Sequence, residues 1–135
     1  MIVLDSSFLI AHHNSNDIHH EGARVLMEGV LAGIYGRALL LEYVFLEVAT
    51  VLLLRRGLAV ATSVALKLME AREVDFRPCS QLFPQVMETF RNQTGERLSF
   101  VDAAVVTVAR QHDPGYVATF DKDFRDIEGV SVLPR

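Results

Sequence analysis

Short runs of apolar residues alternate along the chain with longer segments in which apolar residues recur at helical spacing. The short runs, bounded by turn-forming residues, predict strands at Met1–Asp5, Arg37–Leu41, Val74–Pro78, Tyr116–Phe120 and Val130–Leu133. The longer segments predict helices at Ser6–His13, Asp17–Gly33, Tyr43–Arg56, Val60–Glu73, Gln81–Arg91 and Ser99–His112. Because strands that alternate with helices form βαβ units, the pattern predicts an α/β fold with a mainly parallel sheet of four to five strands.

Two positions sharpen the predicted helix boundaries. Asp17 is a suitable N-cap for the second helix, whose residues Val25, Leu26 and Val30 are spaced to form one apolar face. Gly57 follows the helix Tyr43–Arg56 and is expected to end it.

Length and composition predict one folded domain spanning residues 1–135. The chain has 135 residues, of which half are hydrophobic and 22% are charged, so it is neither disordered nor fibrous. The single Cys79 excludes an intramolecular disulfide and a multi-cysteine zinc site, and it suits a reducing cytoplasm. Met1 leads directly into a strand pattern rather than a basic secretory signal. The most apolar stretch, Leu39–Leu54, is short and contains two glutamates, so we expect a soluble cytoplasmic protein with no membrane span.

Four acidic residues lie against apolar neighbours: Asp5, Glu47, Asp102 and Asp121. The apolar segments around them contain no Lys or Arg, and buried carboxylates need a compensating partner. A divalent metal with oxygen ligands is the simplest such partner. The net charge of −4 comes from 13 basic and 17 acidic residues, so without these four the chain is balanced at 13 and 13. Charge alone therefore argues neither for nor against nucleic-acid binding.

Their predicted positions bring the four acids toward one edge of the sheet. Asp5 and Asp121 directly follow predicted strands, while Glu47 and Asp102 lie early in predicted helices. In open α/β sheets, ligands bind beyond the carboxyl ends of the strands, near the point where the strand order reverses. We therefore expect these four carboxylates to share one site.

Three of the four acids also have a purely local interpretation. Ser99 and Asp102 fit the capping-box pattern, Asp121 is a suitable cap for a short helix through Phe124, and Asp5 is a suitable cap for the first helix. Glu47 is the exception, because its neighbours one turn away include no cation.

The ordered set of motifs resembles the PIN-domain family of metal-dependent ribonucleases, and in particular the VapC-type toxins of toxin–antitoxin pairs. The matching pieces are Val3-Leu4-Asp5-Ser6-Ser7, Phe45-Leu46-Glu47-Val48, Ser99-Phe100-Val101-Asp102-Ala103-Ala104 and Ala118-Thr119-Phe120-Asp121-Lys122-Asp123-Phe124. The resemblance implies a three-layer α/β/α fold, a cluster of Asp5, Glu47, Asp102 and Asp121 that holds Mg²⁺ or Mn²⁺, and hydrolysis of RNA. It also implies a homodimer and a small antitoxin partner, with the apolar helices Tyr43–Leu54 and Val60–Met69 as candidate interfaces.

Within that site we expect Asp5 and Asp102 to bind metal directly, and Glu47 and Asp121 to bind it directly or through water. Ser7 and Thr119 either orient these carboxylates by hydrogen bonds or serve as ordinary turn hydroxyls. The sequence leaves open whether Glu42 takes part and whether Asp121 or Asp123 is the fourth acid. It also leaves open the number of metals and the RNA that is cut.

Other side chains carry weaker signals. The pairs His12-His13 and His19-His20 are more typical of solvated histidines than of a metal site, and Cys79 is more typical of a small buried residue than of a nucleophile. Six basic residues are candidates for phosphate contacts: Arg55, Arg56, Arg91, Arg97, Lys122 and Arg125. Two other functions remain open, a Mg²⁺-dependent phosphoacceptor or signalling module and a catalytically inactive domain that binds a protein.

Overall fold

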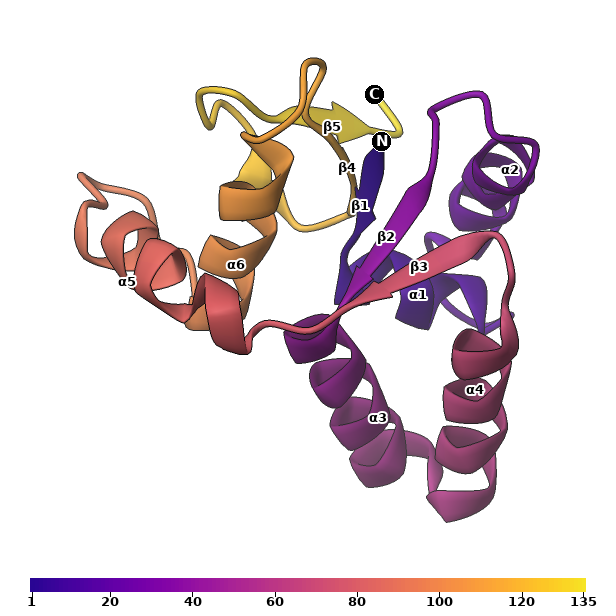
Figure 1. The fold of residues 1–135 in the computed structure, drawn as a ribbon. Helices are drawn as coiled ribbons and strands as arrows, with labels where there is room; N and C mark the ends of the chain where they lie inside the picture. Colours follow the sequence, from indigo (N-terminus) through magenta and orange to yellow (C-terminus); the bar gives the residue numbers. More distant parts are fainter.

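A five-stranded, fully parallel sheet forms the centre of the molecule in the computed structural model, which describes residues 1–135 (Figure 1). The strands are β1 (Ile2–Leu4), β2 (Ala38–Leu41), β3 (Val74–Arg77), β4 (Tyr116–Ala118) and β5 (Ser131–Leu133). Their order in the sheet is β3-β2-β1-β4-β5, and every neighbouring pair is parallel. The predicted α/β fold with a mainly parallel sheet is thus confirmed.

Six α-helices connect and cover these strands: α1 (Ser6–His12), α2 (His20–Leu31), α3 (Glu42–Arg56), α4 (Leu58–Glu70), α5 (Phe83–Arg91) and α6 (Phe100–Ala109). Two single 3₁₀ turns, η1 (Ser80–Leu82) and η2 (Lys122–Phe124), complete the chain. Helices α1 and α2 lie on one side of the sheet and α5 and α6 on the other, while α3 and α4 form a hairpin that extends beyond it (Figure 1). This arrangement is the expected α/β/α sandwich.

The central strands are apolar at every position because helices cover both faces of the sheet. All residues of β1 and β2 are buried, and they belong to a core of 35 buried hydrophobic residues. The edge strand β3 instead alternates apolar and charged residues, and its Asp75 forms a bidentate ion pair with Arg37. Burial therefore decreases from the centre of the sheet to its edge.

Several predicted boundaries are wrong, among them both ends of α4, which spans Leu58–Glu70 rather than Val60–Glu73. Local hydrogen bonds explain two of the errors. Helix α2 begins at His20 rather than Asp17, because the Asp17 carboxylate accepts the His19 backbone N–H (2.7 Å) within a preceding turn. Strand β4 ends at Ala118 rather than Phe120, and the Thr119 hydroxyl accepts the Asp121 backbone N–H in the segment that follows. Helix α6 ends at Ala109, three residues earlier than predicted.

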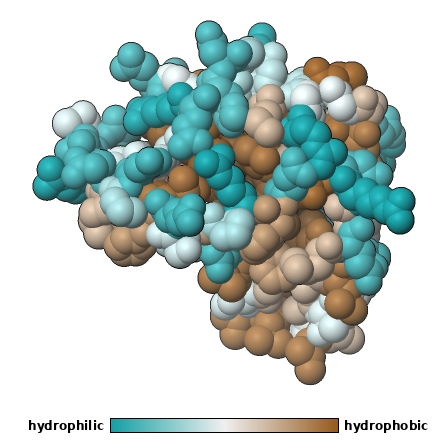
Figure 2. Space-filling model, in the orientation of Figure 1, coloured by the Kyte–Doolittle hydropathy of each residue, from teal (hydrophilic) through white to brown (hydrophobic).

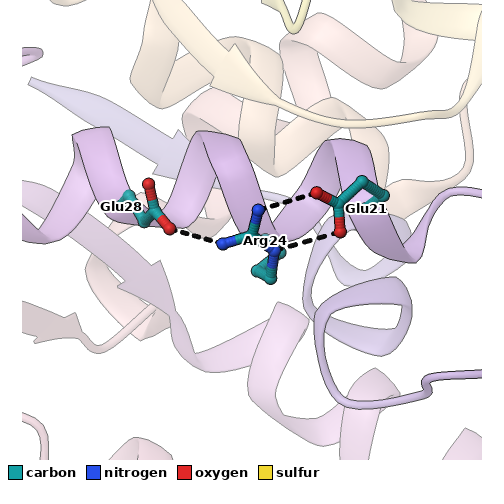
Figure 3. Close-up of polar contacts among 3 residues, drawn as sticks. All are labelled: Glu21, Arg24 and Glu28. Carbon is teal, nitrogen blue, oxygen red and sulfur yellow. Dashed lines mark hydrogen bonds and ion pairs between the residues drawn. The ribbon is translucent and has the colours of Figure 1, made fainter.

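Two helical surfaces differ strongly in character. On the outer face of α2, Arg24 pairs with Glu21 and Glu28 (Figure 3), an exposed network that the solvent screens. The α3–α4 hairpin is largely hydrophobic on its surface (Figure 2). Its exposed apolar residues are Leu46, Leu53, Leu54, Leu58, Leu66 and Met69.

The hairpin turns at Gly57, whose φ of 87° lies in the region that side chains disfavour, so the predicted end of α3 is confirmed. None of the helices combines the length and the apolar character needed to cross a bilayer.

Candidate functional site

The strand order reverses between β1 and β4, and a buried carboxylate lies at that point. The chain runs from β1 to β2 on one side and later returns to place β4 on the other side of β1. Asp5 directly follows β1, and its backbone N–H donates to the Ala118 carbonyl at the end of β4 (3.0 Å). This is the edge at which open α/β sheets bind their ligands.

Asp5 is held from one side only. Its Oδ2 accepts hydrogen bonds from the Thr119 hydroxyl (2.7 Å) and the Ser7 hydroxyl (2.9 Å). The Ser7 Oγ in turn accepts the Phe120 backbone N–H (2.9 Å), which ties α1 to the segment after β4. Asp5 is 2% exposed, yet its Oδ1 has no hydrogen-bond partner. Both hydroxyls thus hold the carboxylate, and each also accepts a backbone N–H of the segment after β4, so the structure shows both of their predicted roles.

Burial raises the pKa of Asp5 above its ordinary value, and the nearby Glu47 carboxylate raises it further. The hydroxyls of Thr119 and Ser7 act in the opposite direction, because they stabilise the charged form. A buried carboxylate with a raised pKa and one unpartnered oxygen is incompletely satisfied by the protein alone.

Glu47 approaches the site from the second turn of α3. Its Oε1 accepts a hydrogen bond from the Ser6 hydroxyl at the start of α1, and the two helices pack together. Ser6 is largely buried, and the sequence analysis did not assign it a role. Its signal in the sequence is its position directly after the strand-ending Asp5, where a hydroxyl in the first helical turn can face the same site.

Asp102 performs the local function that its sequence context predicts. Its Oδ2 accepts the Ser99 backbone N–H (3.1 Å), and the Ser99 hydroxyl accepts the Asp102 backbone N–H (3.1 Å), which completes a capping box on α6. Burial nevertheless raises the pKa of Asp102 to about 6, and the negative charges of Asp5 and Asp121 contribute to that rise. Asp102 therefore lies within electrostatic reach of two other predicted site residues.

Asp121 also serves as a cap, since its Oδ1 accepts the Asp123 backbone N–H (2.9 Å) at the start of η2. The prediction placed Asp121 directly after the strand, but β4 ends at Ala118, three residues earlier. Asp123 is exposed, and of these two acids only Asp121 contributes to the raised pKa of Asp102. Glu42 is bound elsewhere, because its carboxylate accepts the backbone N–H of the buried Cys79 (2.8 Å).

The four acids share one pattern of bonding. Each has one oxygen fixed by a hydrogen bond from the protein, while the other oxygen accepts none. None of the four forms an ion pair, although the molecule pairs other acids with arginine. Oxygen donors with free lone pairs and no countercharge are the set that Mg²⁺ and Mn²⁺ prefer. The residues therefore fit a hard divalent cation.

The side chains are nevertheless not drawn together into a tight cage. No group of three or more Asp, Glu, His or Cys side chains lies close enough to hold one ion as they stand. This spacing is compatible with Mg²⁺, which usually keeps several waters and binds one or two carboxylates directly.

Cations lie beside the acids without pairing to them. Arg55 lines a cleft of about 390 Å³ with Ser7 and Asp121, and Lys122 and Arg125 line a second cleft of about 290 Å³ that also contains Asp121. Two other candidates for phosphate contacts have structural partners. Arg56 donates to the His13 carbonyl (3.1 Å), and Arg91 pairs with Glu88 (3.2 Å).

The two histidine pairs differ, because His12 and His13 contact each other whereas His19 and His20 have different partners. His12 packs edge-on against His13, with ring centroids 4.8 Å apart, and His20 contacts the Ala11 carbonyl through Nδ1 (2.8 Å). His19 instead stacks on Phe120 beside Asp121.

The fold is a parallel α/β/α sandwich, and carboxylates without ion-pair partners lie where its strand order reverses. These two features define the class as an α/β protein with an acidic site at the carboxyl edge of its sheet. The chain belongs to the PIN domain family, whose model matches residues 2–130. Among solved structures it is similar to the crystal structure of VapC20 from Mycobacterium tuberculosis, described as a sarcin–ricin loop cleaving toxin. The two share 27% sequence identity with a TM-score of 0.79, over 91% of this chain and 92% of that chain. A comparison with curated proteins found no significant match. The family resemblance inferred from the motifs is thus confirmed.

Proposed function

We propose that this chain is a metal-dependent endoribonuclease, the toxin of a toxin–antitoxin pair, in which Asp5, Glu47, Asp102 and Asp121 hold Mg²⁺ or Mn²⁺. The observation that carries the proposal is the set of four unpaired carboxylates, each fixed through one oxygen. Membership of the PIN domain family and the likeness to a VapC toxin support the same reaction.

Each acid has a distinct part in the proposed site. Asp5 and Asp102 are the direct ligands, because both have a raised pKa that a bound cation would lower again. Glu47 and Asp121 complete the coordination directly or through water. Ser6, Ser7 and Thr119 keep the carboxylates oriented, as hydrogen-bonded groups behind metal ligands commonly do. When bound, the metal supplies an activated water and neutralises the phosphate that is attacked.

Cleavage of RNA by the purified protein tests this proposal. We expect fragments in the presence of Mg²⁺ or Mn²⁺, none with a chelator, and none from the Asp5→Asn variant with either metal. Asp123→Asn is the matched control, because it removes an exposed acid beside the site and should leave cleavage intact. Cleavage that persists in chelator, or in Asp5→Asn, would contradict the assignment.

The same assay separates the competing functions. A phosphoacceptor module would take up a phosphoryl group at an aspartate and leave RNA intact, and an inactive domain would do neither. The RNA substrates should include a sarcin–ricin loop hairpin, since the similar VapC20 is described as cleaving that loop. Sequencing the products from total RNA identifies the substrate if the hairpin is not cut.

The hydrophobic α3–α4 hairpin supports the proposed partners, a second copy of the chain and an antitoxin. Leu54 is 79% exposed and Leu58 is 70% exposed, and they lie on either side of the turn at Gly57. Monomeric proteins rarely expose contiguous apolar surface of this kind without a partner. Light scattering of the purified chain tests the homodimer, and co-expression with a small neighbouring gene product tests the antitoxin.

A further inference from the structure

An aromatic pair stands beside the acidic site and has no role in the metal chemistry. The rings of His19 and Phe120 stack nearly parallel, with centroids 4.4 Å apart and an interplanar angle of 7°. Phe120 lies between Thr119, which holds Asp5, and Asp121, and His19 is the exposed member of the pair. The stack therefore presents a flat aromatic surface next to the carboxylates.

The stack is held rigidly on both sides. The Phe120 backbone N–H donates to Ser7 Oγ (2.9 Å), so its position is tied to the residues that orient Asp5. The turn that carries His19 is closed by the bond from the His19 N–H to the Asp17 carboxylate (2.7 Å). Gly22 of α2 faces the Phe120 ring, where an added Cβ would lie 3.6 Å from ring carbons. A platform fixed in this way loses little conformational entropy when a ligand stacks on it.

Positive side chains flank the stack. The two clefts at the site have His19, Phe120 and Asp121 in common, so the stack forms the ridge between them. Arg55 lies in one cleft and Lys122 in the other, and neither forms an ion pair within the protein. An aromatic ridge between two unpaired cations matches the alternation of bases and phosphates along a single RNA strand.

We propose that the exposed face of His19 stacks against an unpaired nucleobase next to the phosphate that is cleaved, while Arg55 and Lys122 contact the adjoining phosphates. The proposal rests on the proposed nuclease function and deepens it, because it names a residue that positions the substrate beside the acidic site. A base that stacks on His19 has left its helical stack.

Fluorescence of short single-stranded RNAs tests the stacking directly. Each RNA carries the fluorescent base 2-aminopurine at one position, and the RNAs differ in that position. All binding is measured in Mg²⁺ with the Asp5→Asn protein as the background (the host), because this substitution prevents cleavage. We expect one position at which the fluorescence is quenched on binding. His19→Ala should abolish that quenching and weaken binding roughly 5- to 100-fold, whereas His19→Phe should keep both.

An abasic RNA distinguishes stacking from a structural role of His19. Removing the base at the quenched position should weaken binding to the host by the same factor as His19→Ala, and should have no further effect on His19→Ala itself. Ile18→Ala is the matched control, because Ile18 precedes His19 and is 91% exposed. Losses that add, or an unchanged affinity in a His19→Ala variant of normal melting temperature, would overturn the proposal.

The two proposals fail in different ways. If the wild-type chain cleaves RNA and His19→Ala cleaves it with the same kcat/KM, only the stacking proposal fails. If the wild-type chain cleaves no RNA but quenching depends on His19, the nuclease assignment fails and the base-stacking surface stands.

Discussion

Replacing Asp102 by asparagine should stabilise the metal-free protein at pH 8 while abolishing RNA cleavage. The asparagine keeps an oxygen that can accept the Ser99 N–H, so the capping box on α6 is retained. What the substitution removes is the negative charge, which burial and the charges of Asp5 and Asp121 make unfavourable. A purely structural carboxylate would behave in the opposite way.

The magnitude follows from the raised pKa. The pKa of Asp102 rises from 3.8 to about 6, and each unit corresponds to about 1.4 kcal/mol, which gives an upper limit of about 3 kcal/mol. Asp102 is only half-buried, so solvent screening reduces the expected gain to about 1–1.5 kcal/mol. For a chain of this size, that gain raises the melting temperature by roughly 3–7 °C.

The gain must depend on pH in one direction. Because the folded-state pKa lies above the unfolded-state value, ionisation of Asp102 costs stability as the pH rises from about 4 through about 6. The wild-type chain carries the full cost at pH 8 and almost none below about pH 3, where the carboxyl is protonated in both states. The advantage of Asp102→Asn should therefore shrink steadily as the pH falls from 8 toward 4.

Thermal melts with chelator, at several values between pH 4 and pH 8, measure this difference. Asp123→Asn is the matched control, since it removes an exposed acid close by and should change the melting temperature little at any pH. Added Mg²⁺ should stabilise the wild-type chain and have much less effect on Asp102→Asn. The reasoning is refuted if Asp102→Asn melts below wild type at pH 8, or if its advantage is the same at pH 5 as at pH 8.

Three further substitutions test other parts of the structure. Thr119→Val should lower the free energy of unfolding in urea by about 1–3 kcal/mol and reduce cleavage, because it deletes a hydroxyl that holds Asp5. Thr119→Ser keeps the hydroxyl and should have wild-type stability and cleavage. Leu54→Glu should leave the melting temperature within about 2 °C of wild type, but light scattering should show that the dimer has dissociated. An unchanged oligomer would exclude this surface as the interface. Gly115→Ala should destabilise the fold by at least about 2 kcal/mol, because its Cβ would lie 2.3 Å from the Gly129 carbonyl oxygen; a near-normal denaturant midpoint would contradict that packing.

Helix and strand positions were largely predictable because burial imposes a periodic pattern on the sequence. The central strands β1 and β2 are apolar at every position, as a sheet covered on both faces requires, and Gly57 marks the end of α3. Two of the wrong boundaries, the start of α2 and the end of β4, lie where side chains bond to the backbone. Asp17 illustrates the reason, since it caps a turn rather than a helix, and both conformations use the same residue type.

The acids themselves were found because charged residues are conspicuous in apolar segments, but for Asp5, Asp102 and Asp121 the local context also allowed a capping role. For Asp102 and Asp121 the structure shows the capping role, and it also shows that this role occupies only one oxygen of each carboxylate and leaves the other free. A capping pattern in the sequence therefore does not exclude a role in a site.

The sequence by itself determined the α/β alternation, the family and the four candidate carboxylates, because these depend on residue type, order and short-range spacing. Only the tertiary structure decided which groups surround them. Thr119 reaches Asp5 across 114 positions, Ser6 reaches Glu47 across 41, and His19 meets Phe120 because α2 packs beside the segment after β4. Such contacts are set by how strands pair and helices pack over the whole chain, and no local pattern encodes them.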